Sequence, residues 1–294
     1  MKKVTTSCLI AITAVLLNAC SAETSNRDVK LSQSKAPDSK VAAKPKAVPK
    51  RRSLGCGGPV PVSFRRAPYK LDEFYQQFCD ADGIPILASS QVDPEALRIA
   101  RRRVNIMTQK LSPEVKQAMI DSYTRIAIVG KNERMTDIPE HSDMYEAFPG
   151  TDWNKRARGY GPTKARPAAS VGEENLLCLK GNRLPESDTF VHEFAHAIHY
   201  MGLNNAEPKF QVELNKAYQD AVKKRGLWKG TYASTNYAEY WAKAVQIWFN
   251  LNYTKRSLHK NHINTKAQLK SYDRGLYDLV AKYMPAKSIL ICPK

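Results

Sequence analysis

The twelve residues from Val191 to Gly202, VHEFAHAIHYMG, constrain the fold of this chain more than any other segment. On an α-helix, His192, His196 and His199 fall on one face, because positions i, i+4 and i+7 return to the same side. Residues His192–His196, with Glu193, form the pattern H-E-x-x-H. Its two histidines lie one turn apart and can bind the same zinc ion. The chain must therefore fold so that this helix faces a cavity with room for a metal and a further ligand.

The metal needs a ligand beyond the two histidines of this pattern. A catalytic zinc ion takes three protein ligands and keeps a fourth position for water. On a straight helix His199 lies about 10 Å along the axis from His192, too far to share one ion with it. The longer metzincin pattern H-E-x-x-H-x-x-G-x-x-H is excluded, because His199 replaces its glycine and Gly202 its last histidine. His199 is then left to orient a neighbouring group, to contact substrate or to pack against the next helix.

Glu239 is the remaining candidate for the third ligand. The segment Thr231–Phe249 has apolar residues at helical spacing and predicts a helix, which Thr235 or Asn236 can cap. Glu239 falls in the first turn of this otherwise apolar and aromatic helix, where a carboxylate is costly unless it is paired or bound to a metal. It follows His196 by 43 residues, enough for one intervening helix and a return. The alternative is a glutamate that only stabilises the N-terminus of its helix.

Two motifs of this region resemble those of a known family. H-E-F-A-H followed by Y-x-x-T-N-x-A-E-Y-W-A is similar to the catalytic domain of anthrax lethal factor and its relatives, which are zinc peptidases of the gluzincin type. The match covers about 60 residues, from His192 to Phe249. The resemblance implies one zinc ion on His192, His196 and Glu239, with Glu193 as the general base and Tyr232 stabilising the developing oxyanion.

One position departs from the family pattern. Relatives often have a second glutamate four residues after the ligand glutamate, where this chain has Lys243. Such groups support the metal-binding side chains from behind, so we expect the surroundings of the ligands to differ here. The departure bears on catalytic strength more than on metal binding.

The segment Gly172–Leu177, GEENLL, predicts a sheet edge beside the zinc that pairs with an extended substrate. Glu173 and Glu174 would then contact a basic or amino group of that substrate. The alternative is that these residues only belong to a strand and a turn. Residues 132–172 precede this segment, contain several prolines and glycines, and have the length of a functional loop.

The first twenty residues have the pattern of a bacterial lipoprotein signal. Lys2 and Lys3 precede an apolar run, Cys8–Leu17, that is too short to span a membrane. The sequence L-N-A-C, which ends at Cys20, resembles a lipobox and implies cleavage before Cys20 and lipidation of its thiol. We therefore expect a lipid-anchored protein of the bacterial cell envelope, at the outer membrane if the source is Gram-negative. The alternative is an ordinary signal peptide cut near Ala22.

Composition divides the chain into a signal peptide at 1–19, a disordered tether rich in Lys, Pro and Ala at 20–57, and a zinc metallopeptidase-like domain at 58–294. Of the formal charge of +18, the signal carries +2 and the tether +6, which leaves +10 on the domain. This charge suits an anionic envelope surface, and no nucleic-acid recognition motif accompanies it. Export makes disulfides plausible for the four cysteines that remain, whose pairing the sequence does not fix: Cys56, Cys79, Cys178 and Cys292.

The expected fold class is α+β, a mostly helical zincin-like domain with a small mixed sheet packed before the histidine helix. Strands are expected at 84–89, 125–130 and 170–179. Helices are expected at 71–78, after the caps Asp93 and Ser112, after Ser187 or Asp188, at 208–225 and 236–252, and from Thr265 to about Met284.

The expected function is hydrolysis of an amide bond in a peptide or protein substrate, by a monomer that holds one zinc ion. Two alternatives stay open. One is an envelope module that binds zinc with weak or no catalysis, and the other is a zinc hydrolase of a non-protein envelope amide.

Overall fold

The computed structural model describes residues 56–185, 187–252 and 263–291, which belong to one unit of contacting residues. The signal peptide, the lipidation site Cys20 and nearly all of the tether lie outside the described residues and stay predictions. Within the described ranges, no helix combines the length and the apolar character needed to cross a membrane.

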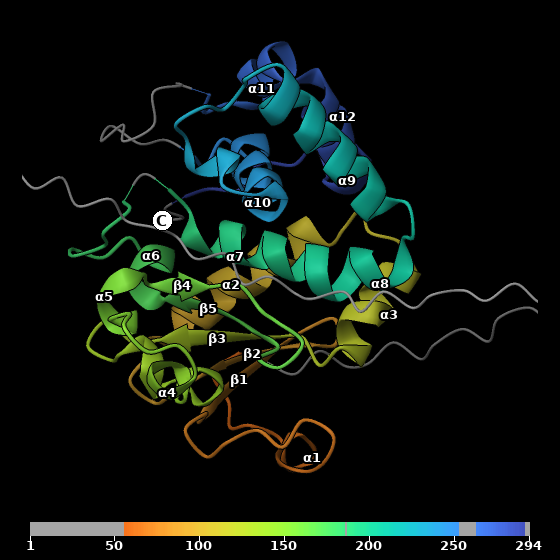
Figure 1. The fold of residues 1–294 in the computed structure, drawn as a ribbon. Helices are drawn as coiled ribbons and strands as arrows, with labels where there is room; N and C mark the ends of the chain where they lie inside the picture. The colour runs from red at the N-terminus through yellow and green to blue at the C-terminus, as the bar shows by residue number, and fades with distance from the viewer. Residues whose placement is uncertain (1–55, 186, 253–262, 292–294) are drawn as a thin grey trace, which may run out of the picture. The chain divides into compact units, whose positions relative to one another are not determined.

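A five-stranded mixed sheet forms the lower layer in Figure 1, in the order β1-β2-β3-β5-β4. Strands β2, β3 and β5 are parallel, whereas β1 and β4 pair antiparallel at the two edges. Their bounds are Gln77–Ala81 for β1, Ile84–Ala88 for β2, Arg125–Val129 for β3, Gly159–Tyr160 for β4 and Ala168–Gly172 for β5. The central strands are apolar along nearly their whole length because both faces of the sheet are covered.

Alternate residues of the strands enter two separate cores. Ile86 and Ile128 point into the larger core, which lies between the sheet and the helices. Leu87 and Val129 point the other way, into a smaller core that is completed by Tyr75 and other residues from the start of the described chain. The period of two along a strand therefore accounts for both cores.

The histidine helix α7 (Thr189–Ala197) lies between the sheet and a layer of C-terminal helices (Figure 1). Helix α10 (Tyr237–Trp248) packs directly on it, and the fully buried Trp241 donates its indole N–H to the Ala195 carbonyl at 2.9 Å. The longer of the other helices are α2 (Pro94–Met107), α3 (Pro113–Asp121), α9 (Phe210–Tyr218), α11 (Lys266–Tyr272) and α12 (Arg274–Tyr283). The short ones are α1 (Val62–Arg65), α4 (Met144–Ala147), α5 (Trp153–Arg156), α6 (Glu173–Leu176) and α8 (Asn204–Ala206).

The α+β class is confirmed, and so are most of the expected elements. Asp93, Ser112 and Thr265 cap their helices through side-chain bonds to backbone amides. Cys56 and Cys79 form a disulfide that ties the start of the described chain to β1. Cys178 is disulfide-bonded as well.

Two expected elements are wrong. The helix at 71–78 is absent from the described structure, where strand β1 begins at Gln77 and forms a hairpin with β2. The signal for that hairpin is the pair Asp82 and Gly83, whose φ angles of 52° and 96° match the two-residue turn that Asp-Gly favours. The strand expected at 170–179 ends at Gly172 and continues as helix α6.

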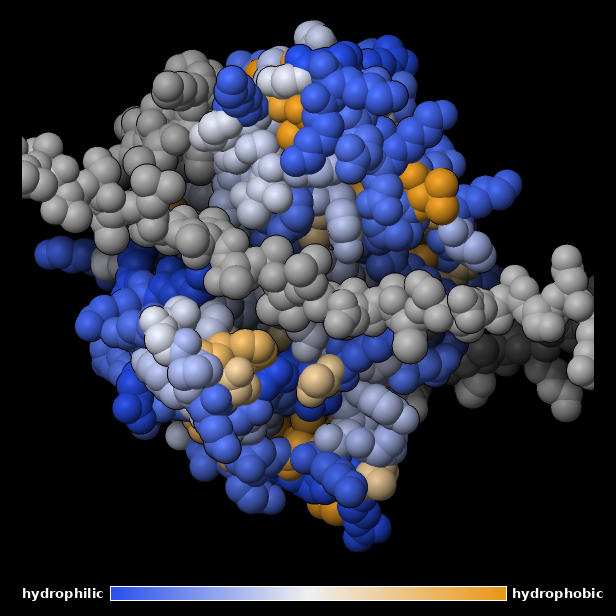
Figure 2. All heavy atoms as spheres, in the orientation of Figure 1, coloured by the Kyte–Doolittle hydropathy of each residue, from blue (hydrophilic) through white to orange (hydrophobic). Residues whose placement is uncertain are grey.

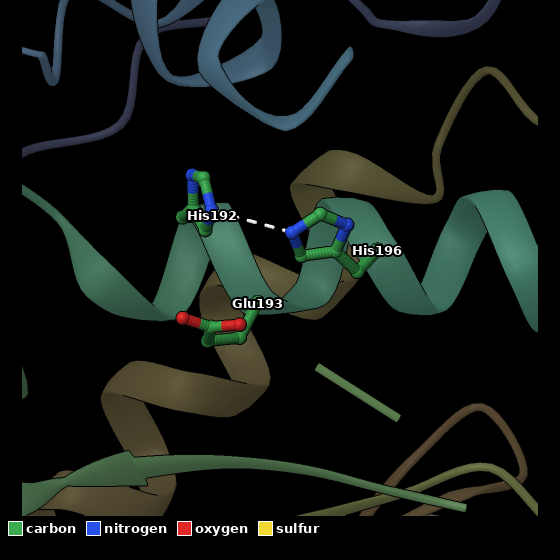
Figure 3. Close-up of side chains that lie close together, drawn as sticks. All are labelled: His192, Glu193 and His196. Carbon is green, nitrogen blue, oxygen red and sulfur yellow. Dashed lines mark hydrogen bonds between the residues drawn. The ribbon is translucent and has the colours of Figure 1, made fainter. Parts of the chain in front are cut away.

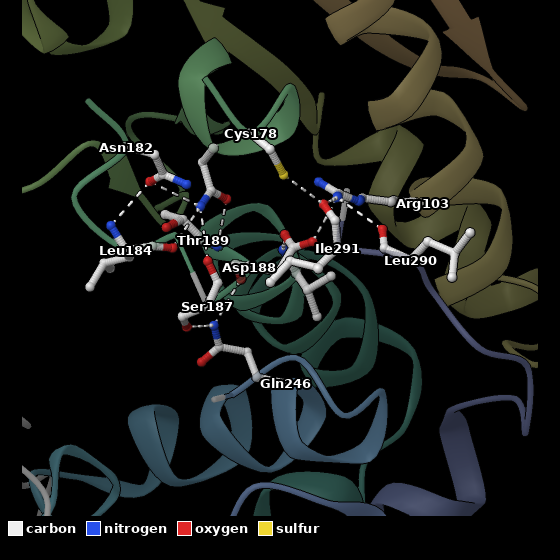
Figure 4. Close-up of polar contacts among 12 residues, drawn as sticks. Arg103, Cys178, Asn182, Leu184, Ser187, Asp188, Thr189, Gln246, Leu290 and Ile291 are labelled. Carbon is white, nitrogen blue, oxygen red and sulfur yellow. Dashed lines mark hydrogen bonds and ion pairs between the residues drawn. The ribbon is translucent and has the colours of Figure 1, made fainter. Parts of the chain in front are cut away.

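The first turn of α7 is fixed by a buried ion pair (Figure 4). The Asp188 carboxylate accepts the Val191 amide at 3.0 Å and lies 2.9 Å from the guanidinium of Arg103 on α2. Arg103 also donates to the carbonyls of Leu290 and Ile291 at 3.3 and 3.0 Å. Helix α2, helix α7 and the last described residues therefore meet at one cation.

Replacing Asp188 by Ala should lower the free energy of unfolding by about 3–5 kcal/mol, because it leaves Arg103 buried without its carboxylate. Urea unfolding measures this loss. The matched control is Arg274→Ala, which breaks an exposed pair with Asp278 and should cost at most about 1 kcal/mol. A loss for Asp188→Ala no larger than that of the control would contradict the assignment.

Candidate metal centre

Helix α7 brings His192, Glu193 and His196 together, as the sequence predicts (Figure 3). The ring nitrogens and a carboxylate oxygen of these residues all lie within 4.8 Å of one another, and the two Nε2 atoms are 3.2 Å apart. The Glu193 carboxylate points to the side of α7 that faces the sheet, where its Cγ lies next to Gly159 of β4. The helix thus presents two nitrogen donors and one adjacent carboxylate.

Glu239 reaches the two imidazoles from helix α10. Its Oε2 lies 2.9 Å from Nε2 of His192 and 3.5 Å from Nε2 of His196. Tetrahedral ligands about 2.1 Å from a zinc ion lie about 3.4 Å from one another. The three donor atoms are therefore spaced as a zinc site needs, and two nitrogens with one oxygen form a ligand set that zinc accepts.

The helix-capping alternative for Glu239 does not account for this position. Asn236 is the cap of α10, and its side chain accepts the backbone amide of Glu239 at 2.9 Å. The Glu239 carboxylate itself is turned toward His192 and His196. Asn236 thus caps the first turn of α10, while the Glu239 side chain projects from that turn into the site.

The charges of the site follow from its burial. Burial lowers the pKa of His192 to about 4, against the opposing hydrogen bond to Glu239. Burial by itself would raise the pKa of Glu239, but the interactions with His192 and His196 outweigh it and hold that pKa well below its usual range. Burial also raises the pKa of Glu193 to about 7. Burial alone would lower the pKa of His196, but the adjacent Glu239 and Glu193 outweigh it and raise that pKa. A metal binds the neutral imidazole and the ionised carboxylate, so it would have to displace a proton where His196 is charged.

Gln246 fixes the orientation of His192. Its Oε1 lies 3.2 Å from Nδ1 of His192 and accepts the Lys243 ammonium at 2.9 Å. Its Nε2 donates to the Ser187 hydroxyl at 3.1 Å and the Asp188 carbonyl at 2.8 Å, as Figure 4 shows. A backbone carbonyl can only accept, so the amide cannot be reversed, and Nδ1 of His192 must donate. This tautomer leaves the Nε2 lone pair free for a metal.

Lys243, which stands where the sequence resemblance leads us to expect a glutamate, acts through a neighbouring residue. It holds the Gln246 amide, and the Asn252 side chain accepts a second bond from it at 2.8 Å. The role of Gln246 was not predicted from the sequence. The available signal was its spacing, since it follows Glu239 by seven residues and so lies on the same face of α10.

Tyr232 lies at the same site, in the turn Tyr232–Ser234 before α10. Its ring centroid is 6.0 Å from that of His192, and the residue lines the cavity. Burial raises the pKa of its hydroxyl, and the nearby charges of Glu239 and Glu193 raise it further. The tyrosine is therefore held in its protonated form, which can donate a hydrogen bond.

The structure places His199 apart from the three donor atoms. It is fully buried in a π-helical turn, Ile198–Leu203, that follows α7. Its Nε2 lies 2.8 Å from Oε1 of Gln211, and its ring packs on those of Tyr200 and Phe210. Of the three roles left open for this residue, the structure has it packing against the following helix, α9.

Glu173 and Glu174 are buried on α6 rather than at a free sheet edge. Glu173 accepts the backbone amides of Asp93 and Lys131 at 2.9 and 2.8 Å. Both oxygens of Glu174 accept from Arg158, at 2.7 and 2.9 Å. The carboxylates thus hold loops and a strand in place.

The free sheet edge beside the histidines belongs to β4. The Arg158 carbonyl and the Tyr160 amide bond to β5, so by alternation the backbone groups of Gly159 and Gly161 face the other way. Both glycines line a cavity of about 580 Å³ that also contains His192, Glu193, His196, Tyr232 and Glu239. A Cβ on Gly161 would lie only 2.9 Å from Cβ of His196, so glycine is what lets α7 approach this strand.

No known protein-family model matches the chain, and no curated protein matches it. Among solved structures it is similar to the PRO-PRO endopeptidase PPEP-2 from Paenibacillus alvei. That similarity has 18% sequence identity and a TM-score of 0.36, and it covers 69% of this chain and 97% of the other. A likeness this distant identifies neither a family nor an activity.

Replacing Gln246 by Leu should weaken zinc binding by about tenfold or more, because His192 then loses the acceptor that fixes its tautomer. Gln246→Glu keeps an acceptor and should retain most of the affinity. Competition with a chromogenic chelator measures both dissociation constants. Gln211→Leu is the control, since it removes an equivalent acceptor from His199 and should leave zinc affinity unchanged.

His199→Ala should keep about one zinc per chain, whereas Glu239→Ala should bind zinc more weakly and with lower occupancy after dialysis. Atomic absorption on the dialysed, folded variants gives both values. If folded His199→Ala loses its metal while Glu239→Ala keeps it, the ligand assignment is wrong.

Proposed function

We propose that this chain is a zinc-dependent peptidase of the gluzincin type, related to the lethal factor group. The observation that carries the proposal is the meeting of three donor atoms, from His192, His196 and Glu239, beside a separate carboxylate and a tyrosine hydroxyl in one cavity. A structural zinc site has four protein ligands and is closed, whereas three ligands facing a cavity leave a position for water.

Zinc bound at these ligands would polarise a substrate carbonyl and acidify a water molecule. Glu193 lies next to the ligands on the same helix, where it can take the proton of the attacking water and pass it to the leaving amine. Tyr232 can donate its hydroxyl proton in a hydrogen bond to the oxygen that becomes negative. His192 is kept in one orientation by Gln246 throughout.

The substrate would lie along β4 rather than along the segment that the sequence suggested. Gly159 and Gly161 turn unpaired backbone groups toward the cavity, and an extended peptide can add to such an edge as a further strand. Their lack of side chains lets a peptide backbone come close. This arrangement would place a scissile carbonyl next to His196.

We further propose that the protein acts as a monomer held at the cell envelope by a lipid on Cys20, with residues 20–57 as the tether. The lipobox-like L-N-A-C supports the anchor, and the Lys- and Pro-rich composition supports an extended linker. The domain is then 58–294, with its own basic charge beside an anionic membrane.

A zinc-binding module with weak catalysis is the second candidate, and Lys243 is the observation that favours it. A neutral amide backed by an ammonium is a poorer partner for His192 than a carboxylate, so the ligand is less basic. Turnover of peptides by the purified protein separates the two candidates.

Glu193→Gln should keep zinc and lower peptide cleavage by about a hundredfold or more, because the amide cannot take a proton. A mixed peptide library, with products identified by mass spectrometry, measures cleavage, and atomic absorption measures zinc. A chelator should abolish wild-type cleavage, and added zinc should restore it. Equal activity of Glu193→Gln and wild type, both loaded with zinc, would exclude the mechanism.

A further inference from the structure

A second cavity adjoins the one that holds the metal ligands. It has a volume of about 310 Å³ and shares Arg158 and Arg183 with the first. Its wall comes from the loop after β3 and from residues 180–183, near the carboxyl ends of two parallel strands. On the face in Figure 2, the surface over α5 and beside α6 is mostly hydrophilic. Because the two cavities share wall residues, a ligand in the first cavity can extend into the second.

The two carboxylates in the wall of the second cavity are already bonded within the protein. Glu133 accepts the Ser89 hydroxyl at 2.7 Å and the Gly130 amide at 2.6 Å. Glu174 accepts from two nitrogens of the Arg158 guanidinium, Nε and Nη2. Among the described residues, neither carboxylate forms an ion pair with Lys131, Lys180 or Arg183.

Four cations around the two cavities have no carboxylate partner among the residues that the structure describes. Arg156 and Arg183 line the first cavity, and Lys131, Lys180 and again Arg183 line the second. Among the described residues, none of these four side chains lies within ion-pair distance of an acidic group. All four are exposed at the cavity walls. A cleft lined by charges of one sign raises the local concentration of ligands of the other sign.

We infer that the proposed peptidase takes acidic peptides, with an Asp or Glu side chain of the substrate bound in the cavity lined by Lys131, Lys180 and Arg183. This inference rests on the proposed function. The planar guanidinium of Arg183 stands where both cavities meet and can bind a carboxylate through two nitrogens. A basic residue at the same place meets three cations and is rejected.

Peptide binding to zinc-loaded Glu193→Gln tests the inference without requiring cleavage. A set of peptides carries Glu, Gln or Lys at each position in turn, and fluorescence anisotropy gives the dissociation constants. At one or more positions on one side of the metal, Glu should bind about tenfold more tightly than Gln, and Lys more weakly than either. Equal binding of Glu and Gln peptides at every position overturns the inference.

The double variant Lys131→Glu and Lys180→Glu, made on the Glu193→Gln protein, should abolish the preference for Glu and favour Lys at the same position. Lys224→Glu carries the same kind of charge change outside both cavities and should leave the preference intact. An equal loss in that control overturns the inference in favour of attraction by the whole basic domain.

Cleavage by the wild type keeps the two proposals apart. If the protein binds acidic peptides selectively but does not cleave them, the peptidase function is excluded and the acidic subsite is retained. If the protein cleaves Glu and Gln peptides with equal kcat/KM, the acidic subsite is excluded and the peptidase function is retained.

Discussion

The arrangement of this molecule depends on a carboxylate that is taken out of water between two helices. Glu239 on α10 is largely buried against His192 and His196 on α7. Such a group is stable only if partners offset its lost hydration. With Nδ1 of His192 protonated, its Nε2 presents a lone pair to this carboxylate, and the Nε2 atoms of the two histidines also lie only 3.2 Å apart. A cation at the centre satisfies all three groups at once, so zinc should stabilise the packing of α7 on α10 by mass action.

That packing is fixed from several directions. Trp241 bonds to the Ala195 carbonyl inside the helix interface, while Gln246 reaches back to the residues that start α7. Asp188, in turn, is tied to Arg103 on α2. The position of the ligand atoms is therefore set by three helices and the last described residues. A change far from the cavity, such as loss of Arg103, can displace the donors by moving the start of α7.

The sequence was most informative where one residue type has one physical use. Asp93, Ser112 and Thr265 were predicted as caps because a short polar side chain before a proline or an apolar run has few other roles. Glu239 stood out because a carboxylate is out of place on an apolar helix. Strand β4 was not predicted, because its two residues, one of them glycine, are too few to show an alternating pattern. The role of Gln246 was not predicted, because glutamine is common on helices. Its role depends on hydrogen bonds to residues 187 and 188, which only the fold brings close.

Position 243 separates geometry from charge. With a glutamate there, a carboxylate could support a histidine directly, whereas here Lys243 positions Gln246 and the amide does the same work of orientation. The tautomer of His192 is preserved, but the local charge is two units more positive than it would be with a glutamate at position 243. Arg156 and Arg183 at the cavity wall add further positive charge. The field over the cleft is thus more positive than the ligand set alone would make it, and such a field favours substrates that bring their own carboxylates.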